Sequence, residues 1–213
     1  MDQHAMPERN LAIQEDAVEA TASSEQTKLL LRVTGVGLFP LFVALGAQVA
    51  IPLPPYGIPM TLQTLAVVLS ALCLGPKLGA SAMALYALMG VIGVPLFAEG
   101  EAGWQVILGQ TGGYLLGFIV CVPVITSIIK RRDGTIRGWG AMITGVVTGH
   151  LVVFFLGVPW LWFIRSTDPG NEITWANAWY YGMVVFLPGM FVKSAIAVWI
   201  GKLAAPWASR NIW

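Results

Sequence analysis

The chain has 213 residues, of which 56% are hydrophobic and only 11% are charged, and its mean hydropathy is +0.72. This composition is typical of a polytopic membrane protein and excludes a soluble globular domain. The formal net charge of +1 indicates no nucleic-acid partner. Cys73 and Cys121 both lie in apolar runs, so we interpret them as small buried residues and not as a disulfide.

The N-terminal segment differs in composition from everything that follows it. Residues 1–26 carry six acidic side chains and few large apolar ones, and we expect a disordered cytosolic tail there. Residues 27–213 are expected to form one membrane domain, whose first span is Leu29–Ile51. Gly46 and Ala50 in this span have the small-residue spacing that lets another helix approach closely. Docking of a partner and packing within the bundle explain that spacing equally well.

A proline-rich connection and a short span come next. Ile51–Met60 contains four prolines and a glycine and cannot be helical throughout, so it is either a lid over a site or a rigid connector. Thr61–Leu74 would cover about 21 Å as a helix, which is less than the ~30 Å of hydrocarbon in a bilayer. Thr61 is its expected cap, and Gln63 lies in its first turn. A short span that follows prolines indicates a site near the membrane face.

Glycine-rich turns separate the next two spans. Gly75–Lys77 predicts a tight turn into the third span, Leu78–Phe97, and the fourth span is Gly109–Ile129. The start of the fourth span combines a capping threonine with two glycines whose amides are expected to be open. Such N–H groups attract an anion or a carbonyl oxygen. The candidate residues at this helix start are Thr111, Gly112, Gly113 and Tyr114.

The last two spans contain the ionisable residues of the apolar runs. In the fifth, Trp139–Phe163, we interpret His150 as a packed, hydrogen-bonded residue in preference to a ligand or a proton carrier. The sixth span, Met183–Leu203, places Lys193 at its middle. A lysine at that depth costs roughly 2.5–3.5 kcal/mol, which indicates a functional role, with a snorkelling lysine as the alternative. Gly189, one turn earlier on the same face, leaves room at the backbone.

The distribution of basic residues predicts the orientation. The segments that would face the cytosol hold ten Lys and Arg residues, whereas the outer loops hold only Arg165. The ten are Arg9, Lys28, Arg32, Lys77, Lys130, Arg131, Arg132, Arg137, Lys202 and Arg210. We therefore expect an all-α membrane protein with six transmembrane helices and with both termini cytosolic. The starts of the second, fourth and sixth helices would then enclose one pocket on the outside.

Motifs of several enzyme classes are missing from the sequence. There is no GxxxxGK[ST], no HExxH, no GxSxG and no Cys/His metal spacing. The apolar runs also contain no Asp or Glu that could relay protons or sodium. We therefore expect no ATPase, no other enzyme, no metal and no cofactor. The sequence favours a binding protein with one buried cation.

Five stretches carry a resemblance to a known family. Residues 59–65 (PMTLQTL) and 74–79 (LGPKLG) resemble the second-helix signature of the BioY family. Residues 90–98 (GVIGVPLFA) resemble its GxxGxPVFA stretch, and residues 109–118 (GQTGGYLLGF) are similar to GPTGGYLxGF. Residues 186–193 (FLPGMFVK) resemble its FxPGDxxK motif. Together the likeness covers about residues 29–203.

The resemblance implies a function. BioY proteins are the substrate-binding S components of energy-coupling factor (ECF) biotin transporters. It therefore implies biotin as the transported ligand, the bacterial inner membrane as the location, and a partner module of a transmembrane coupling subunit and two ATPases. An S component for another vitamin and a membrane-embedded enzyme or assembly factor with a buried lysine are the alternatives. The candidate substrate-binding residues are Lys193, Gln63, Thr111, Gly112, Gly113, Tyr114 and Gly189.

Two positions depart from the family pattern. Gln110 stands where the family has proline, which is expected to loosen the start of the fourth helix. Met190 stands where the family has an aspartate, so Lys193 lacks a partner three residues away on its own helix. Lys193 must then find an anion elsewhere. The candidates are Glu99, Glu101, Asp168, Glu172, backbone carbonyls and the ligand, whose valerate carboxylate would suit.

Overall fold

The computed structural model of the chain describes residues 5–53, 58–168, 170 and 172–213, with side chains from residue 21 onward. Its helices are α1 (Ala5–Gln48), α2 (Gln63–Val91), α3 (Trp104–Leu108), α4 (Gly112–Ile129), α5 (Trp139–Ser166), α6 (Trp175–Gly182) and α7 (Leu187–Asn211). In the described part of the chain, five helical stretches are long and apolar enough to cross a membrane. The prediction of an all-α, multi-pass membrane protein is confirmed.

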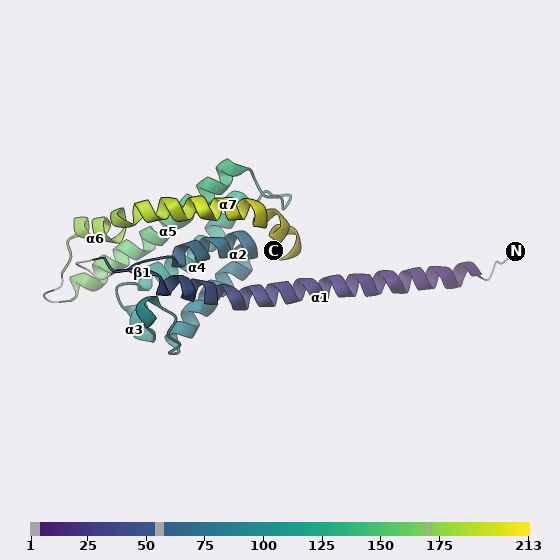
Figure 1. Ribbon diagram of the computed structural model, residues 1–213, viewed down its shortest axis with the longest axis horizontal. Coiled ribbons are helices and arrows are strands. Elements are labelled where there is room, and N and C mark those ends of the chain that lie inside the picture. Colours follow the sequence, from purple (N-terminus) through teal and green to yellow (C-terminus); the bar gives the residue numbers. More distant parts are fainter. Residues whose placement is uncertain (1–4, 54–57, 169, 171) are drawn as a thin grey trace.

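Helix α1 is 44 residues long and projects well beyond the other helices (Figure 1). A disordered tail was predicted over residues 1–26, whereas the structure has helix from Ala5 onward. From residue 8 to residue 34 the sequence contains neither glycine nor proline. A helix that is nucleated in the apolar span therefore propagates backward through residues that propagate helices well, such as Glu, Ala and Gln.

Helix α2 is a hairpin of two antiparallel arms, residues 63–74 and 76–91, joined at Gly75. Gly75 has φ 76° and ψ −171°, a conformation that glycine alone adopts readily. On the two arms, Gly79 packs against the Ser70 carbonyl, and Gln63 Nε2 lies 2.7 Å from the hydroxyl of Tyr86. The turn predicted at Gly75–Lys77 between the second and third spans is therefore present.

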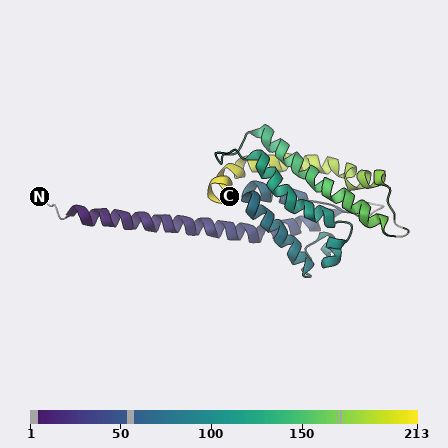
Figure 2. The ribbon, with the colours of Figure 1, turned by 180° about the vertical axis from the view of Figure 1, so that it is seen from behind.

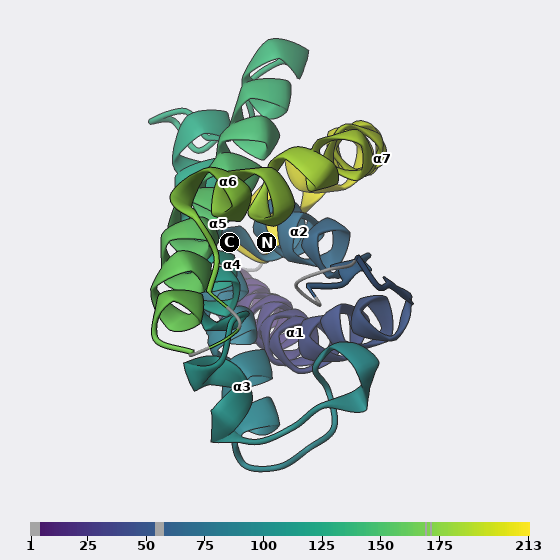
Figure 3. The ribbon, with the colours of Figure 1, turned by 90° about the vertical axis from the view of Figure 1, so that its left-hand side faces the viewer.

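Small residues allow α4 and α5 to pack closely side by side. Gly117 of α4 contacts the backbone of Val153, and Gly149 of α5 contacts the side chain of Ile125. Both glycines lie where an added Cβ would be too close to the neighbouring helix, as expected at a packed membrane-helix interface. Figure 3 looks along the long axis from the end that carries α3 and α6, with α1, α2 and α7 beside this pair.

The C-terminal end of the bundle is held together by polar contacts to the chain terminus. Arg32 Nε of α1 donates to the Ile212 carbonyl at 2.8 Å, and Trp213 Nε1 donates to the Cys73 carbonyl at 3.2 Å. The ammonium group of Lys130 lies 5.3 Å from the centroid of the Trp213 ring. The C-terminus therefore lies at the end of the bundle from which α1 projects (Figure 2).

A two-stranded antiparallel ribbon lies at the opposite end. β1 (Ala50–Ile51) pairs with β2 (Met60–Thr61), so that Ala50 stands opposite Thr61. The ribbon closes the base of the proline-rich connection for which we considered a lid or a rigid connector. Residues 54–57 of that connection lie outside the described residues.

Candidate functional site

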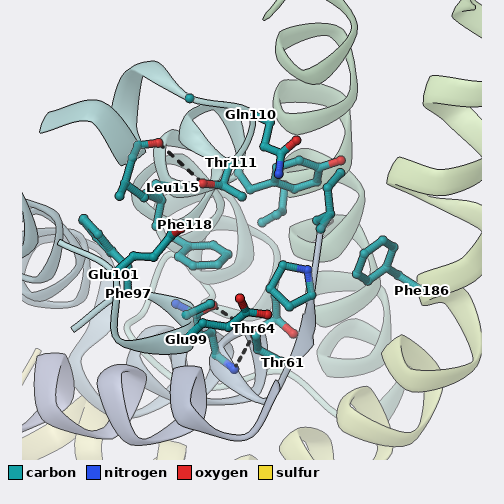
Figure 4. A pocket seen from close by; sticks show the side chains of 18 of the residues that line it. Thr61, Thr64, Phe97, Glu99, Glu101, Gln110, Thr111, Leu115, Phe118 and Phe186 are labelled. Atoms are coloured by element: carbon teal, nitrogen blue, oxygen red, sulfur yellow. Dashed lines mark hydrogen bonds between the residues drawn. The ribbon is translucent and has the colours of Figure 1, made fainter. Parts of the chain in front are cut away.

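A cavity of about 290 Å³ lies at the end of the bundle that carries the β1–β2 ribbon and α3. Its walls come from the segment before α2, the start of α2, residues 97–101, α3, and parts of α4, α5 and α7 (Figure 4). Its polar lining residues are Thr61, Gln63, Thr64, Glu99, Glu101, Gln105, Gln110, Thr111, Tyr114, His150 and Lys193. Its aromatic lining also includes Phe97, Phe118, Phe154 and Phe186. Apolar walls with a few polar groups are typical of sites for small organic ligands.

Lys193 lies in the second turn of α7, lines this cavity and is only 7% exposed. Its Nζ donates to the backbone carbonyl of Thr61 on β2 at 2.9 Å, so one of the expected candidate partners, a backbone carbonyl, is present. The salt bridges found among the described residues are Lys28–Glu25 and Arg165–Asp168, and neither involves Lys193. An ammonium group has three donors, and two of them remain for groups inside the cavity.

A chain of hydrogen bonds fixes Gln63 at the start of α2. Thr61 Oγ1 donates to Gln63 Oε1 at 2.9 Å, and Gln63 Nε2 donates to the Tyr86 hydroxyl at 2.7 Å. Tyr86, which is 1% exposed, donates in turn to the Leu96 carbonyl at 3.0 Å. The Phe97 ring packs edge-on against the Tyr86 ring, and the two ring centroids are 5.6 Å apart. The two arms of α2 and the segment after them are therefore linked directly at the cavity wall.

At the start of α4, Thr111 and Tyr114 line the cavity, but both hydroxyls already have protein partners. Thr111 Oγ1 lies 3.5 Å from the Val106 carbonyl and makes no capping bond to α4. The Tyr114 hydroxyl donates to the Gly182 carbonyl at 2.9 Å. Gln110, which was expected to loosen this helix start, accepts a hydrogen bond from Arg165 Nε at 3.0 Å. The guanidinium group of Arg165 therefore links the start of α4 to the C-terminal end of α5.

Three of the seven predicted site residues, all glycines, are not among the lining residues. The amide of Gly112 was expected to be open, but it donates to the Gly109 carbonyl at 3.2 Å. Gly112 and Gly113 pack against Ile107 and Trp160, where a Cβ would clash. At Gly189 the space is filled by Met60, whose Sδ would lie 2.9 Å from an added Cβ. These glycines bring the walls of the cavity together.

Two lining residues carry buried polar atoms for which the described residues provide no hydrogen-bond partner. They are Thr64, through Oγ1, and His150, through Nε2. The prediction of a hydrogen-bonded His150 holds for its other nitrogen, because Nδ1 lies 3.0 Å from the Val146 carbonyl. Thr64 was missed because a threonine next to Gln63 in an apolar run gives no pattern that separates it from a packing residue.

Fold and site together define a helical membrane protein that encloses a small-molecule cavity with a buried cation in its wall. Residues 18–210 match the sequence model of the BioY family. The chain belongs to the BioY family, which comprises transporter components and not enzymes.

Individual relatives agree with this assignment. The chain is 36% identical over 170 residues to a probable biotin transporter BioY of Pyrococcus horikoshii, covering 78% of this chain and 93% of the relative. It is 32% identical over 176 residues to the biotin transporter BioY of Rhodobacter capsulatus, covering 81% and 92%. The crystal structure of the S-component for biotin from an ECF-type ABC transporter superposes with a TM-score of 0.71 at 25% identity, covering 80% of this chain and 88% of that one.

Proposed function

We propose that this chain binds biotin in the cavity and mediates its uptake across a bacterial cell membrane. Membership of the BioY family and the names of its relatives support the ligand. The incomplete hydrogen bonding of Lys193 is the observation that assigns biotin to this cavity. A buried ammonium with one carbonyl partner and no carboxylate within 4.0 Å among the described residues needs a further acceptor. An oxygen of biotin provides it.

The cavity lining suits the two chemical parts of biotin. Phe97, Phe118, Phe154 and Phe186 provide apolar contact for the thioether ring and the alkyl chain. Lys193 provides a charge-assisted hydrogen bond, and Gln63 with Thr111 and Tyr114 forms a polar wall whose geometry is fixed by the contacts described above. Gly112, Gly113 and Gly189 contribute indirectly, by letting the wall segments approach one another.

In this proposal the chain crosses the membrane six times and both termini are cytosolic. The hairpin at Gly75 supports six crossings, because each arm of α2 would be one crossing. Arg32, Lys130 and the C-terminus meet at one end of the bundle, whereas the cavity lies at the other. The basic end faces the cytosol, so the cavity faces outward. Residues 27–213 form the membrane domain, and residues 1–26 lie on the cytosolic side.

Energy for uptake comes from an ECF module with a transmembrane coupling subunit and two ATPases. The sequence of this chain has no phosphate-binding loop of its own, and its structural relative is an S-component of an ECF-type transporter. α1 exposes a row of large apolar side chains to the bilayer or to such a subunit. These are Leu29, Leu30, Val33, Leu38, Leu41, Phe42 and Leu45. Gly46 is not part of that surface, since it packs against the start of α2.

Binding of labelled biotin to the detergent-purified chain tests this proposal. We expect saturable binding with one site per chain that unlabelled biotin displaces and that thiamine and riboflavin do not. Displacement by another vitamin as effective as that by biotin would reassign the ligand. No saturable binding above that of an unrelated membrane protein would reject the proposal.

A further inference from the structure

Two residues of the cavity wall each carry a buried polar atom that has no partner among the described residues. These atoms are His150 Nε2 on α5 and Thr64 Oγ1 on the first arm of α2. His150 is only 2% exposed, and both residues line the cavity. Native proteins leave few such atoms unpaired, since desolvation without a hydrogen bond costs free energy. Atoms of this kind in the wall of a ligand cavity indicate partners on the ligand.

The contacts of the His150 ring determine which kind of partner is needed. Nδ1 lies 3.0 Å from the Val146 carbonyl, and a carbonyl oxygen can only accept. Nδ1 therefore carries the proton, and Nε2 of the neutral ring is a bare acceptor. Protonation of Nε2 would place a second cation in a cavity that Lys193 already lines. His150 thus offers an acceptor that only an N–H or O–H donor can satisfy.

Lys193 supplies the complementary group. Ser194, the next residue on α7, has its hydroxyl 3.4 Å from His150 Nδ1, so α5 and α7 meet at this point. The wall there presents a donor on Lys193 and an acceptor on His150. A carboxylate has only acceptor atoms and would leave Nε2 unpaired. A cyclic urea has a carbonyl oxygen between two N–H groups and satisfies both.

We propose that His150 Nε2, with the Thr64 hydroxyl, forms a specificity subsite that accepts a ring N–H of the ligand. This inference rests on the proposed function and deepens it, because it assigns the ureido ring of biotin to the buried wall. Lys193 then donates to the ureido carbonyl, and the valerate carboxylate points away from this wall. The subsite selects ligands with an unsubstituted ring N–H over ligands that offer only acceptors.

The test compares biotin with its two ring N-methyl derivatives on purified wild type, His150→Phe and Thr64→Val. Wild type should bind at least one N-methyl derivative about tenfold or more weakly than biotin, because that derivative lacks the donor for Nε2. His150→Phe keeps an aromatic ring without the acceptor. It should bind biotin about 3- to 30-fold more weakly and discriminate between biotin and the same derivative by less than about threefold.

Thr64→Val removes a hydroxyl that the described residues leave unpaired, so its ligand-free melting temperature should not fall while biotin affinity decreases about threefold or more. Thr126→Val is the matched control. The hydroxyl of Thr126 is buried and bonded to the Val122 carbonyl at 3.1 Å, outside the cavity lining. This variant should lose thermal stability and keep wild-type affinity.

The outcomes separate this inference from the proposed function. Wild-type protein that binds biotin but also binds both N-methyl derivatives equally well would overturn the inference alone, as would a folded His150→Phe with wild-type affinity and discrimination. If His150→Phe does not fold, the wild-type comparison and Thr64→Val decide. No biotin binding by wild type would reject the proposed function and the inference with it.

Discussion

At the scale of residues, the polar side chains of the cavity also hold its wall together. Gln63, Tyr86 and the Leu96 carbonyl form a continuous chain of hydrogen bonds behind the lining. Tyr86 itself is not a lining residue, so its hydroxyl acts by positioning Gln63. Removing one member of a buried chain leaves the remaining groups unsatisfied, which costs more than the bond itself contributes.

Tyr86→Phe should therefore destabilise the protein. The change leaves Gln63 Nε2 and the Leu96 carbonyl without their partner, at a cost of about 1–3 kcal/mol. We expect the ligand-free melting temperature to fall by several degrees in a thermal melt. Tyr180→Phe is the control, because Tyr180 is 52% exposed, and it should melt like wild type. Equal melting of both variants would contradict this account of the Tyr86 hydroxyl.

At this scale the sequence singled out residues whose type was unusual for their surroundings. Lys193 could be identified because a charge in an apolar run is costly. Gln63, Thr111 and Tyr114 were also placed in one pocket, and the structure shows them lining one cavity with Lys193. The packing role of Gly112, Gly113 and Gly189 could not be recognised from the sequence. A glycine is equally suitable where a backbone amide is left open and where another segment packs closely against the backbone. Only the neighbours Trp160 and Met60 distinguish the two uses.

At the scale of elements, the hairpin at Gly75 takes α2 from the end of the bundle that holds the cavity to the C-terminal end and back. A Cβ on Gly75 would lie 2.7 Å from the Trp213 ring, and Nε1 of the same ring donates a hydrogen bond to the Cys73 carbonyl. The C-terminal tryptophan therefore packs directly onto the turn. The turn itself was predictable from Gly75-Pro76, since glycine permits the backbone conformation and proline starts the second arm.

Gly75→Ala should destabilise the fold through both the backbone and the packing. The φ of 76° with ψ near 180° is strained for alanine, and the methyl group would displace Trp213, so we expect a loss of at least about 2 kcal/mol. The measurement is a thermal melt beside Gly140→Ala. Gly140 is a helical position with nothing within 4 Å of an added Cβ, so alanine should be neutral or stabilising there. A melting temperature of Gly75→Ala equal to that of wild type would show that the turn tolerates a side chain.

The length of α1 was not predictable in the same way. Acidic composition favoured disorder over residues 1–26, but an uninterrupted run without glycine or proline also permits a helix. Composition alone does not decide between the two. The adjoining apolar span makes the difference, because a helix that is already nucleated extends with little further cost.

At the scale of the whole molecule, the two ends differ in chemistry. One end holds the cavity with Glu99 and Glu101 in its lining, and the other holds the C-terminus with Arg32 and Lys130. From the basic residues the sequence predicted that Arg32, Lys130 and the C-terminus lie on the same side. The enclosure of the cavity by separate parts of the chain required the structure, since long-range contacts such as Lys193 to Thr61 leave no local pattern.

The proposed orientation predicts where reporter fusions become active. With both termini cytosolic, a cytosolic reporter should be active at residue 213 and at the Lys130–Arg137 loop, and inactive in the loop near Asp168. A periplasmic reporter should show the opposite pattern. An external C-terminus would contradict both the six crossings and the outward-facing cavity.

The proposed dependence on separate ATPase subunits makes a further prediction, for the assembled system. The purified chain should hydrolyse no ATP, and vesicles that contain it alone should not accumulate biotin against a gradient when ATP is supplied. Addition of the coupling subunit and the ATPases should enable accumulation. ATP-driven accumulation by the isolated chain would show that the energy does not come from an ECF module.

Calorimetric titration of biotin into purified wild type and Lys193→Met, each with a thermal melt, tests the central claim most directly. The substitution removes the charge and keeps most of the apolar length, so affinity should fall about 10- to 150-fold for a charge-assisted hydrogen bond. The ligand-free variant should melt at or above the wild-type temperature, because a buried charge is removed. Equal affinities together with a lower melting temperature for Lys193→Met would contradict the account and make Lys193 a structural residue.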